Sequence, residues 1–373
     1  MKTMSLLHLP LPSLVSLHVY FNDPRLFTNS LDLFPKFSPS IRKLYIVIDG
    51  FHLENTFRKI EPSYMHRWRN LSSVVCPHVA LDADTLVCLS HMPSLTQLEF
   101  VLDATLPVAA SDSPLVFSNL HEFALHAVSL ELISRFLSRV QPPVITGLGA
   151  VMGSCPSRNE VSSFSASVQT SNAGHTIERL RLDQPPHLQN NLQNNVRSEA
   201  LLLCLQDLRP FMAFNLRQLK LNIGWNVDLM DNELLALASA WPHLETLLIN
   251  EDWGWNTECG STPNGLLQLL QTCQSLSEIG LAIDTRGYTE CRELPASLGV
   301  IFPPGSAIRI PDAMIEVDSM PAVTAFFASL VSCSDVYFSA WSGCGMIRNP
   351  QNVHKDRWDE VLRRVMDAIS RRS

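Results

Sequence analysis

The feature that most constrains this fold is a short phrase that recurs along the chain. It consists of leucine or isoleucine, two variable residues, a second apolar residue, one variable residue and a third apolar residue, as in Leu216-Arg-Gln-Leu219-Lys-Leu221. Clear copies occupy residues 14–19, 41–46, 71–76, 95–100, 120–125, 177–182, 216–221, 244–249 and 276–281. In a strand, alternate side chains share a face, so the last two apolar residues face one way and the residue between them faces the other. One such strand cannot bury its apolar face alone, so the phrase predicts stacked parallel strands backed by helices.

The segments between the phrases have the pattern of those helices. Residues 231–241 offer Asp231 as a capping residue and an apolar stripe, and Thr262-Pro263 is a good helix start. Apart from the irregular stretch after residue 125, the phrases begin roughly 24 to 39 residues apart, the spacing of leucine-rich repeats and their longer variants. The sequence therefore predicts an α/β leucine-rich-repeat solenoid, a horseshoe with a parallel sheet on the concave face and helices on the convex face.

The chain is expected to form one elongated array and a closing helix. We predict about ten irregular repeats over residues 1–350, least regular at 144–173, and a C-terminal capping helix in residues 351–373. Residues 356–370 place apolar side chains on one face and charges on the other, as a cap requires. The first phrase begins near Met1, so the edge of the first strand needs either a very short cap or a preceding segment, and we expect the second.

Composition argues against several classes of protein. No stretch reaches the 18 or more apolar residues of a membrane span. The net charge is −8, and no run of lysines and arginines exceeds three residues, which argues against nucleic-acid binding. The nine cysteines are scattered without a Cys-x-x-Cys pair, which favours an intracellular, cytoplasmic or nuclear location.

No motif predicts catalysis, a cofactor or a metal. The glycines from Gly147 to Gly153 are spaced one residue too widely for a dinucleotide-binding loop, so a glycine-bearing turn is expected. The sequence shows no zinc-ligand spacing and no phosphate-binding loop, and we expect no enzyme. Five aspartates follow predicted strands at comparable offsets: Asp49, Asp103, Asp183, Asp252 and Asp284. They favour turn capping, with a metal-binding or basic-ligand stripe as the alternative.

Two sets of residues are candidates for binding a partner protein. The predicted strand-exit loops of the second half carry Trp225, Trp253, Trp255, Arg286 and Tyr288. The outward positions of predicted strands carry Tyr45, Glu99, Arg181, Lys220 and Glu278. Tryptophan, tyrosine and arginine dominate binding hot spots, because they bury a large area and keep a polar group. The alternative for the tryptophans is that they fill gaps between adjacent loops.

The most specific resemblance lies in Trp241-Pro-His-Leu-Glu-Thr-Leu247, followed by the helix start at Thr262-Pro263 and the phrase at residues 276–281. This combination resembles the irregular leucine-rich-repeat region of fungal F-box proteins, particularly those of mushroom-forming fungi; the F-box itself is not found in this chain. The resemblance implies a substrate receptor of an SCF-type ubiquitin ligase, in which the repeats hold the target protein. A Skp-type adaptor is implied only if an F-box exists upstream. The alternative is a stand-alone leucine-rich-repeat scaffold or inhibitor unrelated to ubiquitin.

Overall fold

The computed structural model divides the chain into two compact units, Met1–Ile177 (unit 1) and Glu178–Ser373 (unit 2). The residues that it describes are 14–21, 40–48, 59–60, 68–103, 114–141, 144–170, 176–185, 201–255, 259–289, 302–331, 335–341 and 353–371. Each unit is built from parallel strands and helices, and each is described separately.

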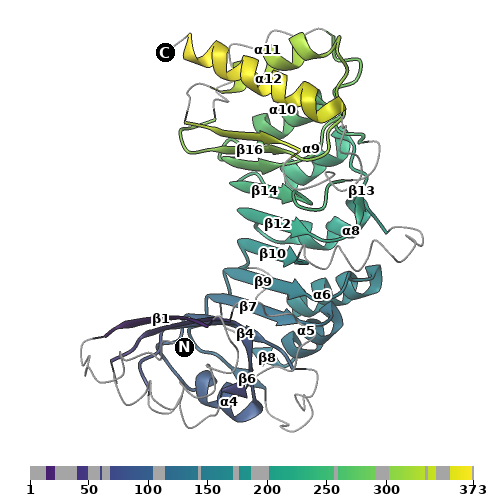
Figure 1. The fold of residues 1–373 in the computed structure, drawn as a ribbon. Coiled ribbons are helices and arrows are strands. Elements are labelled where there is room, and N and C mark those ends of the chain that lie inside the picture. Colours follow the sequence, from purple (N-terminus) through teal and green to yellow (C-terminus); the bar gives the residue numbers. More distant parts are fainter. Residues whose placement is uncertain are drawn as a thin grey trace. The chain divides into compact units, whose positions relative to one another are not determined.

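Unit 1 contains a parallel sheet in the order β1-β2-β4-β5-β7-β9, and Figure 1 shows its strands β7 and β9 side by side. Its elements are β1 Ser16–Phe21, β2 Lys43–Ile48, β3 Lys59–Ile60, β4 Ser73–Leu81, α4 Ala83–Ser90, β5 Gln97–Val101, β6 Leu115–Val116, β7 Glu122–Ala127, α5 Leu130–Leu137, β8 Val140–Gln141, β9 Gly147–Met152 and α6 Arg158–Thr170. The second apolar residue of each phrase is aligned across the sheet. Leu44, Val74, Leu98 and Phe123 pair in this register, which Leu148 of β9 continues, and all five residues are buried.

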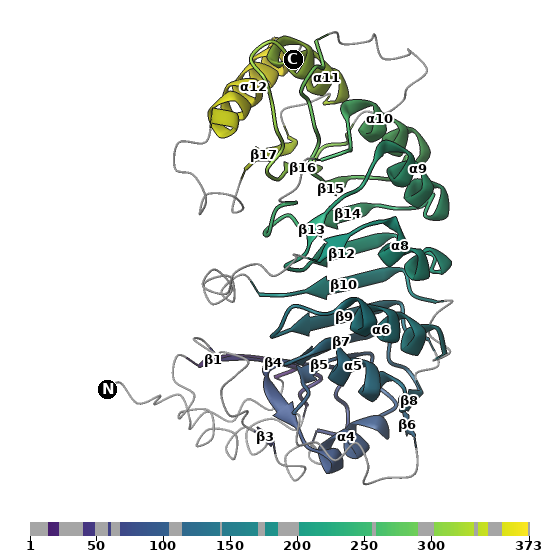
Figure 2. The same cartoon turned by 90° about the vertical axis from the view of Figure 1, so that its right-hand side faces the viewer.

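Unit 2 repeats this arrangement in the order β10-β12-β14-β15-β16-β17. Its elements are β10 Arg179–Asp183, β11 Leu202–Leu203, α8 Leu205–Leu208, the 3-10 helix η2 Arg209–Ala213, β12 Gln218–Asn222, β13 Asn226–Val227, α9 Asp231–Ala240, β14 Thr246–Ile249, α10 Pro263–Thr272, β15 Glu278–Gly280, β16 Ala307–Ile310, α11 Met320–Leu330, β17 Tyr337–Ala340 and α12 Val353–Ser370. Helices α9 and α10 lie on one side of β12 and β14 (Figure 2). The parallel sheet and the helices behind it confirm the predicted leucine-rich-repeat fold.

The capping residues of α9 and α10 agree with the sequence-based prediction in one case and differ from it in the other. Thr262 caps α10 as predicted, because its side chain accepts a hydrogen bond from the N–H of Asn264 at 3.2 Å. The N-cap of α9 is Met230 and not Asp231. Asp231 instead accepts hydrogen bonds from the N–H of Thr262, at 2.7 Å, and from its hydroxyl, at 2.6 Å. Asp231 therefore joins the start of one helix to the start of the next.

The prediction of a glycine-bearing turn at residues 147–153 is wrong. Gly147–Met152 form β9, which pairs in continuous register with β7. A Cβ atom at Gly147 would lie 2.1 Å from a carboxylate oxygen of Glu122, and one at Gly149 would lie 3.1 Å from the Cβ of Ala124. The glycines therefore mark close packing across two strands, a use of glycine that local sequence does not distinguish from a turn.

A buried asparagine fixes the chain where β14 ends. Asn250 is fully buried and has a φ of 52°, in the left-handed region that asparagine tolerates better than most residues. Its side chain accepts a hydrogen bond from the N–H of Ile223 at 2.9 Å and donates one to the carbonyl of Trp225 at 2.7 Å. One side chain therefore satisfies two buried backbone groups of the preceding repeat.

The C-terminal helix packs against the last repeat. α12 contacts α11 and β17, and buries Trp358, Val361, Val365 and Ile369 on one face. The indole N–H of Trp358 donates to the carbonyl of Ala313 at 2.9 Å. This is the apolar stripe that the sequence predicts, although the proposed boundary at residue 350 stays a prediction. Within the described ranges, no helix is both long and apolar enough to cross a membrane.

We predict that Asn250→Ala lowers the free energy of unfolding by roughly 1–3 kcal/mol for each backbone group that it leaves without a partner. Urea unfolding followed by circular dichroism measures the change. Asn264→Ala on the exposed surface of α10 is the matched control, for which a change within about 0.5 kcal/mol is expected. Equal stability of the two variants would contradict the structural role of Asn250.

Candidate functional site

The side of the unit 2 sheet opposite the buried leucines carries two aligned rows of residues. The first row is Arg179, Gln218, Thr246, Glu278, Ala307 and Tyr337, and the second is Arg181, Lys220, Leu248, Gly280, Arg309 and Ser339. We call these two rows the open face. The outward positions predicted at Arg181, Lys220 and Glu278 all belong to it.

An ion-pair network organises the centre of the open face. Glu278 accepts a hydrogen bond from Nη1 of Arg309 at 2.6 Å, and its second oxygen lies 3.5 Å from Nζ of Lys220. Glu251, just beyond β14, lies 3.2 Å from Nε of Arg309. The same guanidinium lies 5.8 Å from the ring centroid of Tyr337, in reach of a cation–π interaction. Arg309 is therefore held in place from three sides.

Gly280 makes room for this network. It lies between Leu248 and Arg309 in the second row. A Cβ atom at Gly280 would lie 3.0 Å from Cδ2 of Leu248 and 3.5 Å from Cβ of Glu251. Because glycine has no side chain, Leu248 and Glu251 close over the sheet here, and Leu248 is only 3% exposed.

The pKa values of the two carboxylates in the network are shifted in opposite directions. Burial opposes the ionisation of Glu278, but the hydrogen bonds and charges of Arg309 and Lys220 outweigh it and lower its pKa. Burial raises the pKa of Glu251, and the attraction of Arg309 only partly offsets the burial. The network therefore favours the ionised form of Glu278, whereas burial disfavours the ionised form of Glu251.

A second polar cluster borders the open face where β10 and β12 end. Arg181 forms an ion pair with Asp183. The side-chain amide of Asn222 donates hydrogen bonds to Asp183 at 3.2 Å and to Asp252 at 2.6 Å. Two of the aspartates singled out in the sequence are therefore joined through one amide group.

The structure places two of the three strand-exit tryptophans in the interior. Trp225 and Trp255 are both 0% exposed. The indole N–H of Trp255 donates to the carbonyl of Ile249 at 2.9 Å. Trp253 is half-buried, and its indole N–H donates to the carbonyl of Gln184 at 3.2 Å. Packing between loops, the alternative interpretation, accounts for Trp225 and Trp255, because no surface of either side chain is left for a partner.

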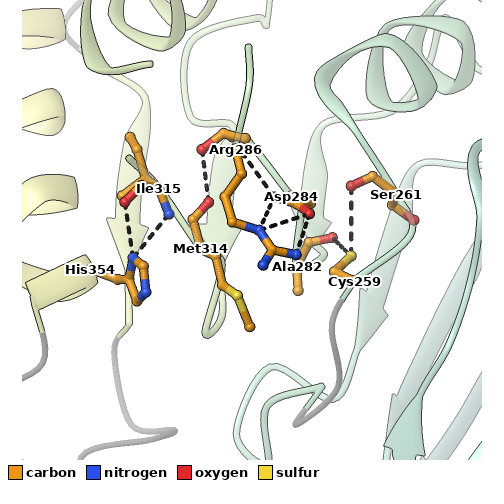
Figure 3. A network of polar contacts seen from close by, with 9 residues as sticks. Cys259, Ser261, Ala282, Asp284, Arg286, Met314, Ile315 and His354 are labelled. Atoms are coloured by element: carbon orange, nitrogen blue, oxygen red, sulfur yellow. Dashed lines mark hydrogen bonds and ion pairs between the residues drawn. The ribbon is translucent and has the colours of Figure 1, made fainter. Parts of the chain in front are cut away.

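Arg286 and Tyr288 also contact their own unit. Arg286 lies against Asp284, with Nε–Oδ1 and Nη2–Oδ2 distances of 3.0 and 2.8 Å (Figure 3). Asp284 also accepts a hydrogen bond from the backbone N–H of Arg286 at 2.9 Å, as expected of a turn-capping aspartate. The ring of Tyr288 meets Phe326 edge-on at 6.0 Å. Both residues help to order this loop, and both stay partly exposed.

The two predicted outward residues of unit 1 contact other residues of that unit. The ring of Tyr45 stacks with His18 at 5.3 Å and lies 6.0 Å from the ring of Tyr20. Glu99 lies 2.8 Å from Nε2 of His126. Burial, followed by the neighbouring Tyr20 and Glu99, raises the pKa of Tyr45.

The alternative of a metal-binding aspartate stripe gains no support. Among the described residues, no group of three or more histidines, cysteines, aspartates or glutamates is placed to hold a metal ion. Asp183 and Asp252 accept hydrogen bonds from the side-chain amide of Asn222. Asp284 accepts a hydrogen bond from Arg286. Asp49 lies outside the described residues.

Three residues of the open-face network were not predicted from the sequence. Arg309 and Tyr337 belong to strands whose sequences, Ala-Ile-Arg-Ile and Tyr-Phe-Ser-Ala, contain no leucine and so do not show the repeat phrase. Glu251 lies beyond its strand, and only the fold brings it to Arg309. The alternation of Ile308, Arg309 and Ile310 is the one signal that could have identified Arg309 as an outward residue.

Comparisons with known proteins give little further information. No protein-family model and no curated protein matches the sequence. Among solved structures, a chain in the crystal structure of the Rad7 and Elc1 complex in yeast is similar, with a TM-score of 0.42 and 11% sequence identity. The match covers 86% of this chain and 68% of that chain. Similarity at this level does not identify a function, which has to be argued from the residues themselves.

We predict that Trp255→Ala lowers the free energy of unfolding by about 3–5 kcal/mol, since it removes a fully buried indole. Trp253→Ala is expected to cost clearly less, because that side chain is half-buried. Chemical denaturation of both variants tests this order. A smaller loss for Trp255→Ala than for Trp253→Ala would overturn the assignment of Trp255 to the core.

We also predict that Glu251→Gln stabilises the protein at neutral pH. Because the folded-state pKa of Glu251 is raised, its contribution to stability is complete below the unfolded-state pKa and is lost as the pH rises through the folded-state value. A neutral glutamine avoids that loss, so the gain should be present at neutral pH and disappear in acid, where glutamate is itself protonated. Denaturant titrations at both pH values measure it. Destabilisation at neutral pH would show that the ion pair with Arg309 outweighs burial.

Proposed function

We propose that this chain is a non-catalytic protein-binding repeat protein and that the open face of unit 2 contacts the partner. The observation that carries the proposal is the network of Lys220, Glu278 and Arg309 beside Tyr337, whose side chain is 58% exposed. Arginine and tyrosine are common at binding hot spots. Side chains already held by ion pairs lose less conformational entropy when a partner binds, so the network is suited to recognition.

The resemblance to fungal F-box proteins supports a narrower proposal, in which the chain is the substrate-receptor part of an SCF-type ubiquitin ligase. The residues of the Trp-Pro phrase have a structural role. Trp241 is fully buried, and its indole N–H donates to the carbonyl of Phe211 at 3.3 Å. Leu244 and Leu247 are buried in the strand that follows. The phrase thus supports kinship in the repeats, and the ligase role is inferred from that resemblance alone.

The alternative, a stand-alone scaffold or inhibitor, uses the same open face without an adaptor. The two proposals differ in whether a Skp-type adaptor binds the full-length gene product, which an adaptor pull-down measures directly. Both proposals place the protein in the cytoplasm or nucleus, in keeping with its scattered cysteines. Neither requires a cofactor or a metal.

We predict that a Lys220→Ala, Tyr337→Ala double variant loses at least one partner that the unaltered protein captures. Quantitative affinity capture from the source cells, followed by mass spectrometry, measures the loss. Weakening by at least about tenfold is expected, which corresponds to 1.4 kcal/mol.

The matched control is Asn264→Ala, Gln268→Ala, which alters two exposed positions of α10 on the helix side of unit 2. Circular dichroism and urea unfolding establish that both variants are folded. Identical sets of captured proteins for the unaltered chain and the open-face variant would remove the open face from the proposal.

A further inference from the structure

We infer that unit 1 binds an arginine side chain of a partner protein between Tyr45 and Glu99, with Tyr20 beside them. This inference goes beyond the proposed function, because it concerns a surface of unit 1 and does not depend on the open face of unit 2. It follows from the way in which unit 2 holds one of its own arginines, and from the residues that unit 1 has at matching positions.

In unit 2 a tyrosine and a glutamate hold an arginine between them. Glu278, Ala307 and Tyr337 lie in one row on the neighbouring strands β15, β16 and β17. Arg309 follows two residues further along the middle strand. Its guanidinium donates a hydrogen bond to Glu278 at 2.6 Å and lies 5.8 Å from the ring centroid of Tyr337. A planar guanidinium can lie against an aromatic ring and donate to a carboxylate at the same time.

Unit 1 has the tyrosine and the glutamate at the same spacing, with proline in place of the arginine. Tyr45, Val75 and Glu99 lie in one row on the neighbouring strands β2, β4 and β5. At about 4.8 Å between strands, the backbone positions of Tyr45 and Glu99 are about 10 Å apart, as in the row of unit 2. Their order along the chain is reversed, which leaves the spacing unchanged. Two residues further along the middle strand is Pro77, where the register between β4 and β5 shifts.

Glu99 can accept a guanidinium and keep its present partner. Its Oε1 lies 2.8 Å from Nε2 of His126, and its side chain is 24% exposed, close to the 25% of Glu278. A carboxylate accepts hydrogen bonds at both oxygens, so the second oxygen can receive a guanidinium N–H. Burial is the main cause of the raised pKa of Tyr45, and the neighbouring Tyr20 and Glu99 add to it. The charge of Glu99 therefore acts where the aromatic rings lie.

Tyr20 supplies a second ring for the same cation. Its ring centroid lies 6.0 Å from that of Tyr45, the two planes are inclined at 51°, and Tyr20 is 65% exposed. A cation about 5 Å from both centroids lies about 4 Å from the line that joins them, within the range of a cation–π interaction with each ring. His18 stacks on Tyr45 at 5.3 Å. The ring of Tyr45 is therefore ordered before a partner binds, which lowers the entropic cost of binding.

The charges around the site favour a cation from outside. On the strand positions of unit 1 that face this side, Lys43 contributes +1, and Glu99 and Glu122 contribute −2, which gives −1 with histidine neutral. Tyr20 pairs in register four residues beyond Lys43, so their backbone positions are at least about 13 Å apart and Tyr45 lies between them. The net charge of the whole chain, −8, also attracts a basic segment.

Selection from a random heptapeptide display library on the full chain tests the inference, with enrichment of arginine as the expected result. Replacement of that arginine by citrulline, a neutral group of nearly the same shape, should weaken binding at least about tenfold in fluorescence polarisation. Tyr20→Leu should weaken binding of the arginine peptide at least about threefold, and Glu99→Gln should weaken it as well. Tyr20→Phe is the matched control, because it keeps the ring and should leave the affinity unchanged.

Circular dichroism and urea unfolding establish that these variants are folded. Enrichment of peptides without arginine, no enrichment, equal binding of the citrulline peptide, equal affinities of the two Tyr20 variants, or unchanged affinity in Glu99→Gln would each contradict the inference. Loss of binding in the Lys220→Ala, Tyr337→Ala variant but not in Tyr20→Leu would assign the arginine to the open face of unit 2 and overturn the site in unit 1. The capture experiment on cellular partners tests the proposed function separately, so the two can fail independently.

Discussion

The hydrogen-bonded register between successive parallel strands is the constraint on which this structure depends. In unit 2 it aligns Leu180, Leu219, Leu247, Ile279 and Ile308 on the buried side. The same register necessarily aligns Arg181, Lys220 and Arg309 on the opposite side, because side chains alternate along a strand. A slip of one residue would turn leucines outward and charges inward, so core formation and the placement of the open face cannot be separated.

The ends of the strands are fixed by hydrogen bonds that point into the protein. Asn250 bridges two backbone groups, and the indole groups of Trp255 and Trp341 donate to carbonyls at 2.9 and 3.0 Å. Large polar-tipped side chains thus satisfy buried backbone groups in the irregular turns, where the sheet ladder offers no partner. This explains why tryptophans gather at the strand exits although Trp225 and Trp255 have no exposed surface there.

The sequence predicts the strands well because the period of two is a local property, visible in any six residues. It predicts the position of Lys220 for the same reason. Whether Trp255 is buried depends on which loop covers it, and whether Gly149 lies in a turn or a strand depends on the neighbouring Ala124. Arg309 was missed because its strand lacks leucine, although it has the same alternation. Tertiary contact, rather than periodicity, decides each of these features.

The ion pairs of the open-face network add little to the stability of the fold. Partly exposed ion pairs contribute only about 0–1 kcal/mol, and the raised pKa of Glu251 means that its ionised form is less favoured in the folded protein than in water. Uncharged, β-branched residues would cover the same sheet without that penalty. Local departures from what stability favours are expected at functional sites. The arrangement that holds Arg309 between Glu278 and Glu251 therefore supports the binding role proposed for the open face.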